Sequence, residues 1–429
     1  MSDERVFAKC AWRLIPFIGL LYLLSYIDRV NVGFAALTMN RDLDFSPAVY
    51  GFGAGVFFLG YCGFHVPATV ILHRVGARRT IFSILAAWGA LSAGCALVQG
   101  PLSFYVLRFL LGVAEAGFVP GMLLYLTYWF PQDYQGRLTA GFMTAVPFAF
   151  VIGGPLSGLI LGMDGIAGIR GWQWLFLLEG LPTVFLAFAA LKLLPDGPAR
   201  ASWLSDEEKA AIAARLVTED NAEDHRLLPA LRDPRILALG LVGFGLTCTL
   251  YGVQLWLPQM VQAMGFSNRA TGFIVAVPGA AAIGAMILLG RSSDKRGDRV
   301  WHIALGMVFG AAGLIVAGFA QAYIVVLVAL GFAFVGPIAA VPLLNSLPGS
   351  FLRGRAAAGG IGLYLAITNL GGFAGPYILG ALKGESGNYT SGMAALALGL
   401  LLASLLVVAL GRAMAPRPIA ARANVGEVA

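Results

Sequence analysis

Long apolar segments alternate with short polar connections along almost the whole chain. A helix needs about 20 mostly apolar residues to cross the hydrocarbon core of a bilayer. Segments of this kind lie near residues 12–38, 48–72, 80–98, 102–129, 136–163, 171–194, 235–263, 270–290, 301–320, 322–350, 356–382 and 390–411. The pattern predicts an all-α polytopic membrane protein with 12 transmembrane helices.

The longest polar stretch, residues 195–234, divides the apolar segments into two equal sets. Within it, Ser205 is followed three residues later by Glu208, a spacing typical of the capping box that begins a helix. We therefore expect an N-terminal six-helix bundle at 1–194 and a cytoplasmic linker with one amphipathic helix at 195–234. A C-terminal six-helix bundle with a short tail is expected at 235–429.

Composition supports the membrane assignment, since 59% of the 429 residues are hydrophobic and 12% are charged. Soluble globular proteins have about 25% charged residues. The four cysteines are scattered without a disulfide or metal-binding spacing. The sequence contains neither a nucleophile–base set nor a phosphate-binding loop. We expect no enzyme activity, no metal site and no cofactor.

The basic residues are unevenly distributed between the two sides of the predicted membrane. If the N-terminus is cytoplasmic, the external loops hold four of the 29 Lys and Arg residues, namely Arg41, Arg170, Arg269 and Lys383. Cytoplasmic loops normally carry the excess of Lys and Arg. Both termini are therefore expected in the cytoplasm. The net charge of +7 then reflects membrane topology, and no nucleic-acid partner is expected.

Three short motifs recur in the two halves at nearly one spacing. A His-Arg-x-Gly-x-Arg segment at 73–78 and an Asp-Lys-x-Gly-x-Arg segment at 294–299 are 221 positions apart. The Gly-Pro pairs at 154–155 and 375–376 have the same separation, and GRLTAG at 136 and GRAAAG at 354 are 218 apart. The matches predict a duplicated six-helix unit, and parallel repeats of this kind occur in transporters that hold substrate between their halves.

Five charged residues fall inside the predicted spans, and all are in the first half: Asp28, Arg29, Arg108, Glu115 and Glu179. A charge at the bilayer centre costs about 3 kcal/mol on insertion scales, so such residues usually face a cavity and serve a function. Arg108 and Glu115 are seven residues apart and share a helix face. Asp28, Arg29, Arg108 and Glu115 could form one network, with Asp28 between Arg108 and Glu115 and with Gly112 opening room for another group.

These charges suggest how an anion and a proton could be coupled. The fork of an Arg side chain binds a carboxylate bidentately. An anion that binds Arg29 competes for the charge that holds a neighbouring carboxylate ionised, which then favours protonation. Asp28 and Glu115 are the candidate proton carriers, and Arg108 and Asn31 support the network. A fixed structural pair remains an alternative for Arg108, and a structural role is favoured for Glu179.

The motifs at these positions resemble a known transporter family. YIDRVNVGFA at 26, RFLLGVAEAGFVPG at 108, GWQWLFLLEGLP at 171, LYGVQLWLPQM at 250 and AAAGGIGLYLAITNLGGFAGPYILG at 356 resemble the anion:cation symporters of the major facilitator superfamily. The resemblance implies two pseudo-symmetric six-helix bundles that work by alternating access. It also implies proton-coupled import, with the tartrate and phthalate permeases nearest.

The resemblance implies roles for individual residues. Asp28 and Glu115 match the proton-carrying carboxylates, and Arg29 matches the arginine that binds the substrate carboxylate. Tyr61 and Asn369 match substrate contacts from the two halves. The gating-loop residues that correspond to the superfamily signature are Arg74, Arg78, Asp294 and Arg299, although His73 stands where the family usually has an acid.

Departures from the family bear on the substrate. Asn345 stands where many relatives have tryptophan, and the segment around Pro147 is apolar where the sugar-acid branch has glutamine. A smaller or more aromatic carboxylate is favoured. From the residues alone, Tyr251 and Gln254 share a helix face and are cavity candidates, with an interfacial position equally open for Tyr251. An interfacial position is favoured for Trp256.

The leading hypothesis is a proton-coupled symporter for a small organic carboxylate: a hydroxy-dicarboxylate, a sugar acid or an aromatic carboxylate. An exporter or facilitator of organic anions is the alternative within transport, and a non-transporting membrane sensor is the alternative from another class. The expected partners are the organic anion, protons and the lipid bilayer. We expect a monomer in a bacterial cytoplasmic (inner) membrane.

Overall fold

The computed structural model describes residues 3–131, 133–136, 138, 145–217, 233–350 and 354–414. Twelve helices in the described part are long and apolar enough to cross a membrane, which confirms the predicted fold class. The first set comprises α1 (Asp3–Asp42), α2 (Pro47–Val75), α3 (Ala77–Gly94), α4 (Pro101–Glu115), α5 (Phe118–Thr127), α7 (Ala145–Ile160) and α8 (Gly171–Leu193). The second comprises α11 (Pro234–Gln262), α12 (Asn268–Arg296), α13 (Val300–Phe319), α14 (Tyr323–Ser346), α15 (Gly354–Ser386) and α16 (Thr390–Met414).

The fourth span is divided into α4 and α5 by a short break after Glu115. Pro120, the third residue of α5, lacks the N–H that would otherwise bond to the carbonyl of Ala116. The break therefore follows from the sequence FVPG and falls directly after Glu115, the second of the two charged residues in this span.

The linker contains a helix whose start agrees with the sequence pattern. In α9 (Asp206–Val217), the backbone N–H of Glu208 donates to Ser205 Oγ, and the N–H of Ser205 donates to Glu208 Oε2, at 3.2 and 2.8 Å. This reciprocal pair is the predicted capping box. Lys9 Nζ of α1 also donates to Glu208 at 2.8 Å, so α9 lies against the beginning of α1.

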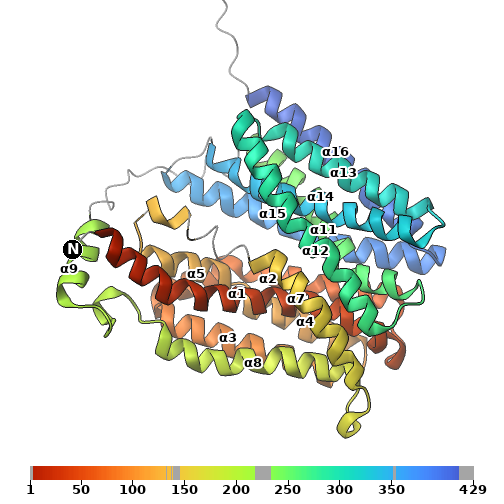
Figure 1. Ribbon diagram of the computed structural model, residues 1–429, viewed down its shortest axis with the longest axis horizontal. Coiled ribbons are helices and arrows are strands. Elements are labelled where there is room, and N and C mark those ends of the chain that lie inside the picture. The colour runs from red at the N-terminus through yellow and green to blue at the C-terminus, as the bar shows by residue number, and fades with distance from the viewer. Residues whose placement is uncertain are drawn as a thin grey trace, which may run out of the picture.

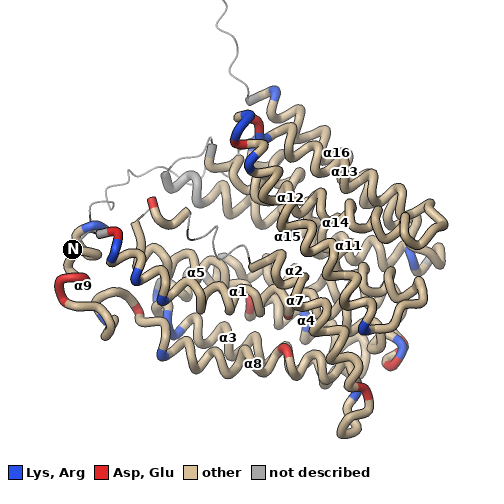
Figure 2. Tube along the Cα trace, viewed as in Figure 1, with Lys and Arg blue, Asp and Glu red and all other residues tan. Residues whose placement is uncertain are grey.

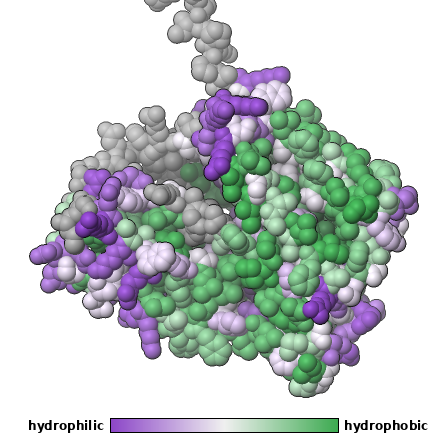
Figure 3. Space-filling model, in the orientation of Figure 1, coloured by the Kyte–Doolittle hydropathy of each residue, from purple (hydrophilic) through white to green (hydrophobic). Residues whose placement is uncertain are grey.

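Figure 1 shows the two sets of helices as two groups that meet at the right and separate toward the left, where the N-terminus and α9 lie. We call the left end the linker side and the right end the far side. Figure 2 shows charged residues concentrated near helix ends, with few in the helical middle. The outer surface along the helices is predominantly hydrophobic in Figure 3, as expected for a surface facing lipid.

Glycine residues allow the two groups to approach closely on the far side. A Cβ atom added to Gly51 of α2 would lie 2.5 Å from the carbonyl oxygen of Pro376 in α15. One added to Gly154 of α7 would lie 2.6 Å from the carbonyl oxygen of Gly272 in α12. Small residues at helix interfaces permit this backbone contact in membranes. Pairing of α2 with α15 and of α7 with α12 therefore closes the far side.

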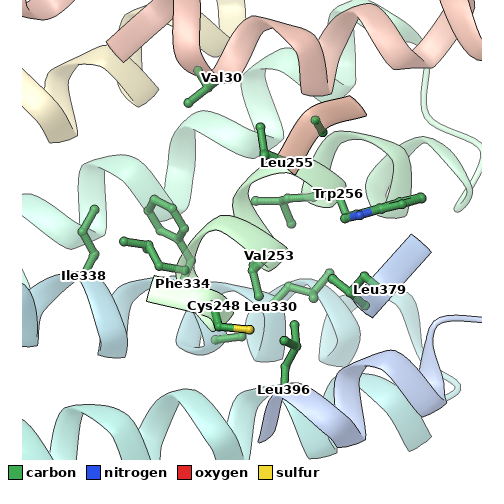
Figure 4. Close-up of a cluster of buried hydrophobic side chains, with 14 of the residues drawn as sticks. Val30, Cys248, Val253, Leu255, Trp256, Leu330, Phe334, Ile338, Leu379 and Leu396 are labelled. Carbon is green, nitrogen blue, oxygen red and sulfur yellow. The ribbon is translucent and has the colours of Figure 1, made fainter. Parts of the chain in front are cut away.

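Helix α11 forms the centre of the second group. Its side chains pack against α14, α15 and α16, as Figure 4 shows around Val253, Leu330, Phe334 and Leu396. Leu255 of the same helix faces α1, where its carbonyl oxygen would lie 2.9 Å from a Cβ atom added to Gly33. Helix α11 thereby carries side chains from the second group to the charged part of α1.

Candidate functional site

The centre of the candidate site is an ion pair between the first and fourth spans. Arg29 Nη2 of α1 lies 2.8 Å from Glu115 Oε2 of α4, and the two side chains are 8% and 1% exposed. Two charges removed from water in this way require close mutual contact and further hydrogen bonds. The pair places an arginine and a carboxylate, both predicted site residues, in direct contact.

Aromatic rings surround the Arg29 guanidinium. Its central carbon lies 5.1 Å from the ring centres of Tyr26 and Tyr61 and 5.2 Å from that of Phe57. The face of an aromatic ring attracts a cation, and the attraction is stronger where water is excluded. The rings therefore help to keep Arg29 charged in a buried position.

The second group of helices reaches the site through Tyr251 of α11. Tyr251 Oη accepts a 3.5 Å hydrogen bond from Arg29 Nη1, and its ring packs on Phe58 of α2 with ring centres 4.4 Å apart. Tyr251 is buried, so the structure places it in the site and not at the membrane interface. Arg29 is thus held by residues from both groups.

Asp28, although adjacent to Arg29, faces a different neighbour. Its carboxylate accepts hydrogen bonds from Trp88 Nε1 of α3 at 2.6 Å, from Asn31 Nδ2 at 3.0 Å and from the hydroxyl of Ser92. Successive residues on a helix point about 100° apart, which directs Arg29 toward α4 and Asp28 toward α3. Asp28 lies inside the first group and not in the gap between the groups.

The expected network of Asp28 between Arg108 and Glu115 is wrong in its contacts. Arg108 is fully buried, and none of its three guanidinium nitrogens has a hydrogen-bond partner among the described residues. Its guanidinium lies 5.1 Å from the ring centre of Phe57 and interacts electrostatically with Asp28 and Glu115. Glu115 is bonded to Arg29 instead, which leaves Arg108 beside the pair.

Gly112 explains part of this difference. A Cβ atom added there would lie 1.9 Å from the carbonyl oxygen of Phe57, so α2 packs directly on α4 at this position. The expectation that Gly112 opens room for another group is therefore wrong. The face between Arg108 and Glu115 is occupied by the backbone of α2.

Two predicted polar contacts lie apart from Arg29. Asn369 of α15 is partly buried, and no contact in the described part joins it to Arg29 or Glu115. Asn345 lies near the linker-side end of α14, is exposed, and accepts a 2.7 Å hydrogen bond from Tyr364 Oη. Neither residue is recorded in contact with Arg29 or Glu115 among the described residues.

The predicted gating residues lie at linker-side ends of their helices. Arg74 is exposed, and Arg78 donates to the backbone carbonyl of Leu191 in α8. Asp294 accepts at its backbone carbonyl from Gly297, and Arg299 precedes α13. Within the described ranges, no ion pair joins these residues across the two groups. This agrees with the separation of the groups on this side.

Three further side chains with polar atoms are buried. Trp256 is fully buried and donates to the carbonyl of Pro376 at 3.1 Å, so the expectation of an interfacial position is wrong. Gln254 is also buried. Glu179 of α8 is buried and accepts a 2.9 Å hydrogen bond from Ser157 Oγ of α7.

The sequence interpretation did not identify Trp88 and Ser92 as partners of Asp28. Both lie on one face of α3, four residues apart. Two side chains that can donate hydrogen bonds, at this spacing in an apolar span, were the sequence signal for a buried acceptor. It also missed Phe57, whose ring lies near both Arg29 and Arg108.

A cavity of about 1140 Å³ opens on the linker side between α1 and α7. Its lining includes Trp12, Leu23, Phe148 and Ile152. Leu23 lies one helical turn before Tyr26, so the cavity ends close to the ion pair without including Arg29 or Glu115.

Comparison with known proteins agrees with this fold. Residues 18–376 match the model of the Major Facilitator Superfamily, and the chain belongs to this family of transporters. It is a multi-pass membrane protein and not an enzyme.

Two relatives and one solved structure are similar to this chain over most of its length. A protein named "Putative tartrate transporter" from Agrobacterium vitis is 44% identical over 423 residues, which cover 98% of this chain and 94% of the relative. A "Quinolone resistance transporter" from Acinetobacter baumannii is 40% identical, with 94% of each chain covered. A bacterial homologue of the lysosomal transporter Spinster, solved in an inward-facing and unoccupied conformation, has a TM-score of 0.78 at 17% identity. It covers 94% of this chain and 97% of its own, and supports the fold.

Proposed function

We propose that this protein is a proton-coupled symporter that imports a small organic carboxylate, with tartrate as the first substrate to test. The proposal depends mainly on the contact between Arg29 and Glu115. A buried arginine at the junction of two helix groups suits an anionic substrate, because its fork matches the geometry of a carboxylate. The name of the Agrobacterium relative supports tartrate.

The proposed coupling is a competition for Arg29. Glu115 occupies one nitrogen of the guanidinium, and Nε has no hydrogen-bond partner among the described residues. Protonation of Glu115 removes its negative charge and frees Arg29 for the substrate carboxylate. When the substrate leaves, Arg29 again favours the ionised form of Glu115, and the proton is released. Proton and substrate therefore bind together.

Tyrosine hydroxyls surround the place where the carboxylate would bind. Tyr61 and Tyr251 approach Arg29 from the two helix groups, and Tyr26 approaches from its own helix. Such hydroxyls can donate to substrate hydroxyl or carboxylate oxygens. We assign Tyr61 and Tyr251 to substrate binding, and Asn369 and Asn345 to contacts made when the second group closes. Arg108 supplies positive potential beside the site, and Asn31 positions Asp28.

We propose that the two groups, 1–194 and 235–429, rock about the site while the linker at 195–234 joins them. The far side is closed by the glycine contacts of α2 with α15 and of α7 with α12, and the groups separate on the linker side. Arg74, Arg78, Asp294 and Arg299 would meet when the linker side closes. The positive-inside distribution supports a cytoplasmic linker side in a bacterial inner membrane, and a monomer contains the whole site.

Uptake into proteoliposomes tests this function. With purified protein and an imposed inside-alkaline gradient, labelled tartrate should accumulate above its external concentration, and a protonophore should prevent accumulation. Glu115→Gln should lose gradient-driven accumulation and retain exchange of tartrate across the membrane. The matched control is Glu207→Gln in the exposed part of α9. Equal final concentrations on both sides in the wild type would indicate a facilitator, and gradient-driven loss of tartrate would indicate an exporter.

The name of the Acinetobacter relative suggests a quinolone as a different substrate. A small set of carboxylates and a quinolone should therefore be tested as competitors of tartrate. Competition by carboxylates that lack aromatic rings would support an anion site built on Arg29. Competition by the quinolone alone would favour the exporter hypothesis.

A further inference from the structure

A second cavity, of about 690 Å³, lies at the linker-side end of the first helix group, apart from Arg29 and Glu115. It is formed by the ends of α2, α5 and α8, the beginning of α3 and the segment that follows α8. The charged residues in its lining are Arg74, Arg78, Arg79, Asp196 and Arg200. Four cations and one carboxylate therefore line the same small volume, which favours an anionic ligand.

Most of these positive charges have no carboxylate partner within the described residues. Arg200 Nη1 lies 2.8 Å from Asp196 Oδ2, and this is the one carboxylate in the lining. Arg78 donates through Nη2 to a backbone carbonyl of α8, and its buried Nε has no hydrogen-bond partner in the described part. No ion pair of Arg74 or Arg79 occurs in the described ranges. Positive charges held close together repel one another, and a bound anion removes this repulsion.

The beginning of α3 adds backbone donors to the same cavity. Gly76 and Ala77 line it, and Gly76 at the N-cap has no side chain that could accept from the first N–H groups of this 18-residue helix. A Cβ atom added to Gly76 would meet only Asp196 Oδ1, at 4.0 Å, so the space in front of these N–H groups is open. Unpaired N–H groups and the helix dipole make such an end favourable for a phosphate group.

The position of the cavity at the edge of the hydrophobic surface indicates where the phosphate comes from. Val75 lines the cavity and is exposed, and so is Ile71, one turn earlier in α2. Leu193 at the end of α8 is exposed as well. Figure 2 shows Lys and Arg at the left ends of α3 and α8. Exposed apolar side chains of a membrane helix contact lipid tails, and basic pockets at helix ends bind anionic headgroups.

We propose that this cavity binds a phosphate group, and that the headgroup of an anionic phospholipid supplies it. The guanidinium forks of Arg79 and Arg200 suit phosphate oxygens, as do the N–H groups at the beginning of α3. The hydroxyl group of Tyr128, which also lines the cavity, is a further donor. The bound phosphate ties the connection between α2 and α3 to the segment after α8. No described residue of the second group lines the cavity, so the site does not depend on which substrate is transported.

Lipid binding to the purified protein tests this site without a transport measurement. Native mass spectrometry from an uncharged detergent counts the molecules of phosphatidylglycerol or phosphatidylcholine that stay bound. The wild type should retain phosphatidylglycerol in preference to phosphatidylcholine, whose headgroup has no net charge. Arg79→Gln and Arg200→Gln should each weaken phosphatidylglycerol binding by at least about tenfold, because each removes a guanidinium fork. No preference for phosphatidylglycerol in the wild type would overturn the proposal.

Arg215→Gln is the matched control for these two variants. Arg215 is exposed on the same side of the molecule, pairs with Asp133 at 3.4 Å and does not line the cavity. The substitution removes the same charge and should leave phosphatidylglycerol binding unchanged. An equal loss in all three variants would indicate a general attraction between a basic protein and an anionic lipid, and would overturn the cavity as the site.

Asp196→Asn changes the cavity in the opposite direction. It removes the carboxylate of the lining and releases Arg200 from its ion pair, so phosphatidylglycerol should bind more tightly. A gain of binding cannot result from misfolding, whereas unchanged or weaker binding would contradict the proposed position of the phosphate.

Inorganic phosphate distinguishes the two possible sources. If a lipid headgroup occupies the cavity, millimolar inorganic phosphate should neither displace phosphatidylglycerol nor raise the temperature of unfolding. Displacement of the lipid, together with stabilisation by inorganic phosphate alone, would identify a soluble phosphate compound as the ligand and overturn the lipid assignment.

Discussion

The guanidinium of Arg29 and the carboxylate of Glu115 are 2.8 Å apart at the place where the two helix groups meet. The side chains come from α1 and α4, and Tyr251 of α11 completes the contact from the second group. An event that separates Arg29 from Glu115 is therefore positioned to affect both groups.

Arg29→Lys should weaken tartrate binding by at least about tenfold, which corresponds to about 1.4 kcal/mol. Lysine keeps the positive charge and loses the planar fork that binds a carboxylate bidentately. Tartrate-dependent stabilisation against thermal unfolding measures the change, because a ligand stabilises the state it binds.

Arg41→Lys is the matched control for this substitution, since the Arg41 side chain is 79% exposed at the far side. It should leave the tartrate-dependent shift unchanged. An Arg29→Lys protein that binds tartrate as the wild type does would show that the fork of Arg29 is not the anion site.

Glu115→Ala should destabilise the protein strongly, by about 3–5 kcal/mol, because it leaves Arg29 buried without its charge partner. Glu115→Gln should cost less, since the amide oxygen can still accept a hydrogen bond. Unfolding midpoints in detergent compare the variants. Equal midpoints for Glu115→Ala and the wild type would show that the ion pair contributes little to folding.

Gly51→Ala should disturb closure of the far side, since the new Cβ atom would lie 2.5 Å from the Pro376 carbonyl oxygen. Labelling of a cysteine introduced in place of Gln259 reports this closure, because Gln259 accepts a hydrogen bond from Asn40 across the groups at 3.3 Å. The labelling rate should rise several-fold in Gly51→Ala.

Gly63→Ala, in the same helix, provides the control for this substitution. A Cβ atom there meets no atom within 4 Å, so the labelling rate should stay at the wild-type level. Equal rates in the two alanine variants would mean that far-side closure does not depend on the close approach of α2 to α15.

Docking of α9 should weaken at acid pH. The hydrogen bond from Lys9, with that from the backbone of Ser205, lowers the pKa of Glu208. A carboxylate with a lowered pKa in the folded state contributes stability at pH values above its unfolded pKa of about 4.3, and this contribution is lost as the pH falls through the folded value. Docking should therefore persist at neutral pH and fail only below the ordinary range of a glutamate.

Fluorescence of Trp203 measures this docking, because its ring stacks on Trp129 with centres 5.5 Å apart. The difference between the wild-type spectrum and that of Trp203→Phe gives the fluorescence of Trp203. In Glu208→Gln the acid transition should vanish, whereas Glu207→Gln, at an exposed neighbouring position, should keep it. An acid transition that persists in Glu208→Gln would contradict the assignment.

Much of the fold could be predicted from the sequence, because a bilayer imposes span length and hydropathy directly on the chain. The capping box of Ser205 and Glu208 was also readable, since it depends on residues three positions apart. The break in the fourth span was not predicted, although Pro120 carried the local signal.

The site could be predicted only in part. Helical geometry gives the angle between Asp28 and Arg29, but it does not say which helix packs on each side. The expected network therefore placed Asp28 with Arg108 and Glu115, whereas Asp28 bonds to Trp88 and Ser92 of α3. Trp256 was misjudged for a similar reason: its place near a helix end indicated the membrane interface, but α11 is surrounded by other helices.

The most direct test of the central claim is the affinity of purified protein for tartrate at different pH values, in the wild type and in Glu115→Gln. Carboxylic acids have ordinary pKa values of about 4, so tartrate itself stays ionised between pH of about 6 and 8. If Glu115 competes with the substrate for Arg29, wild-type affinity should fall as the pH rises through this range, and the affinity of Glu115→Gln should stay constant. The same loss of affinity with rising pH in both proteins would contradict the account.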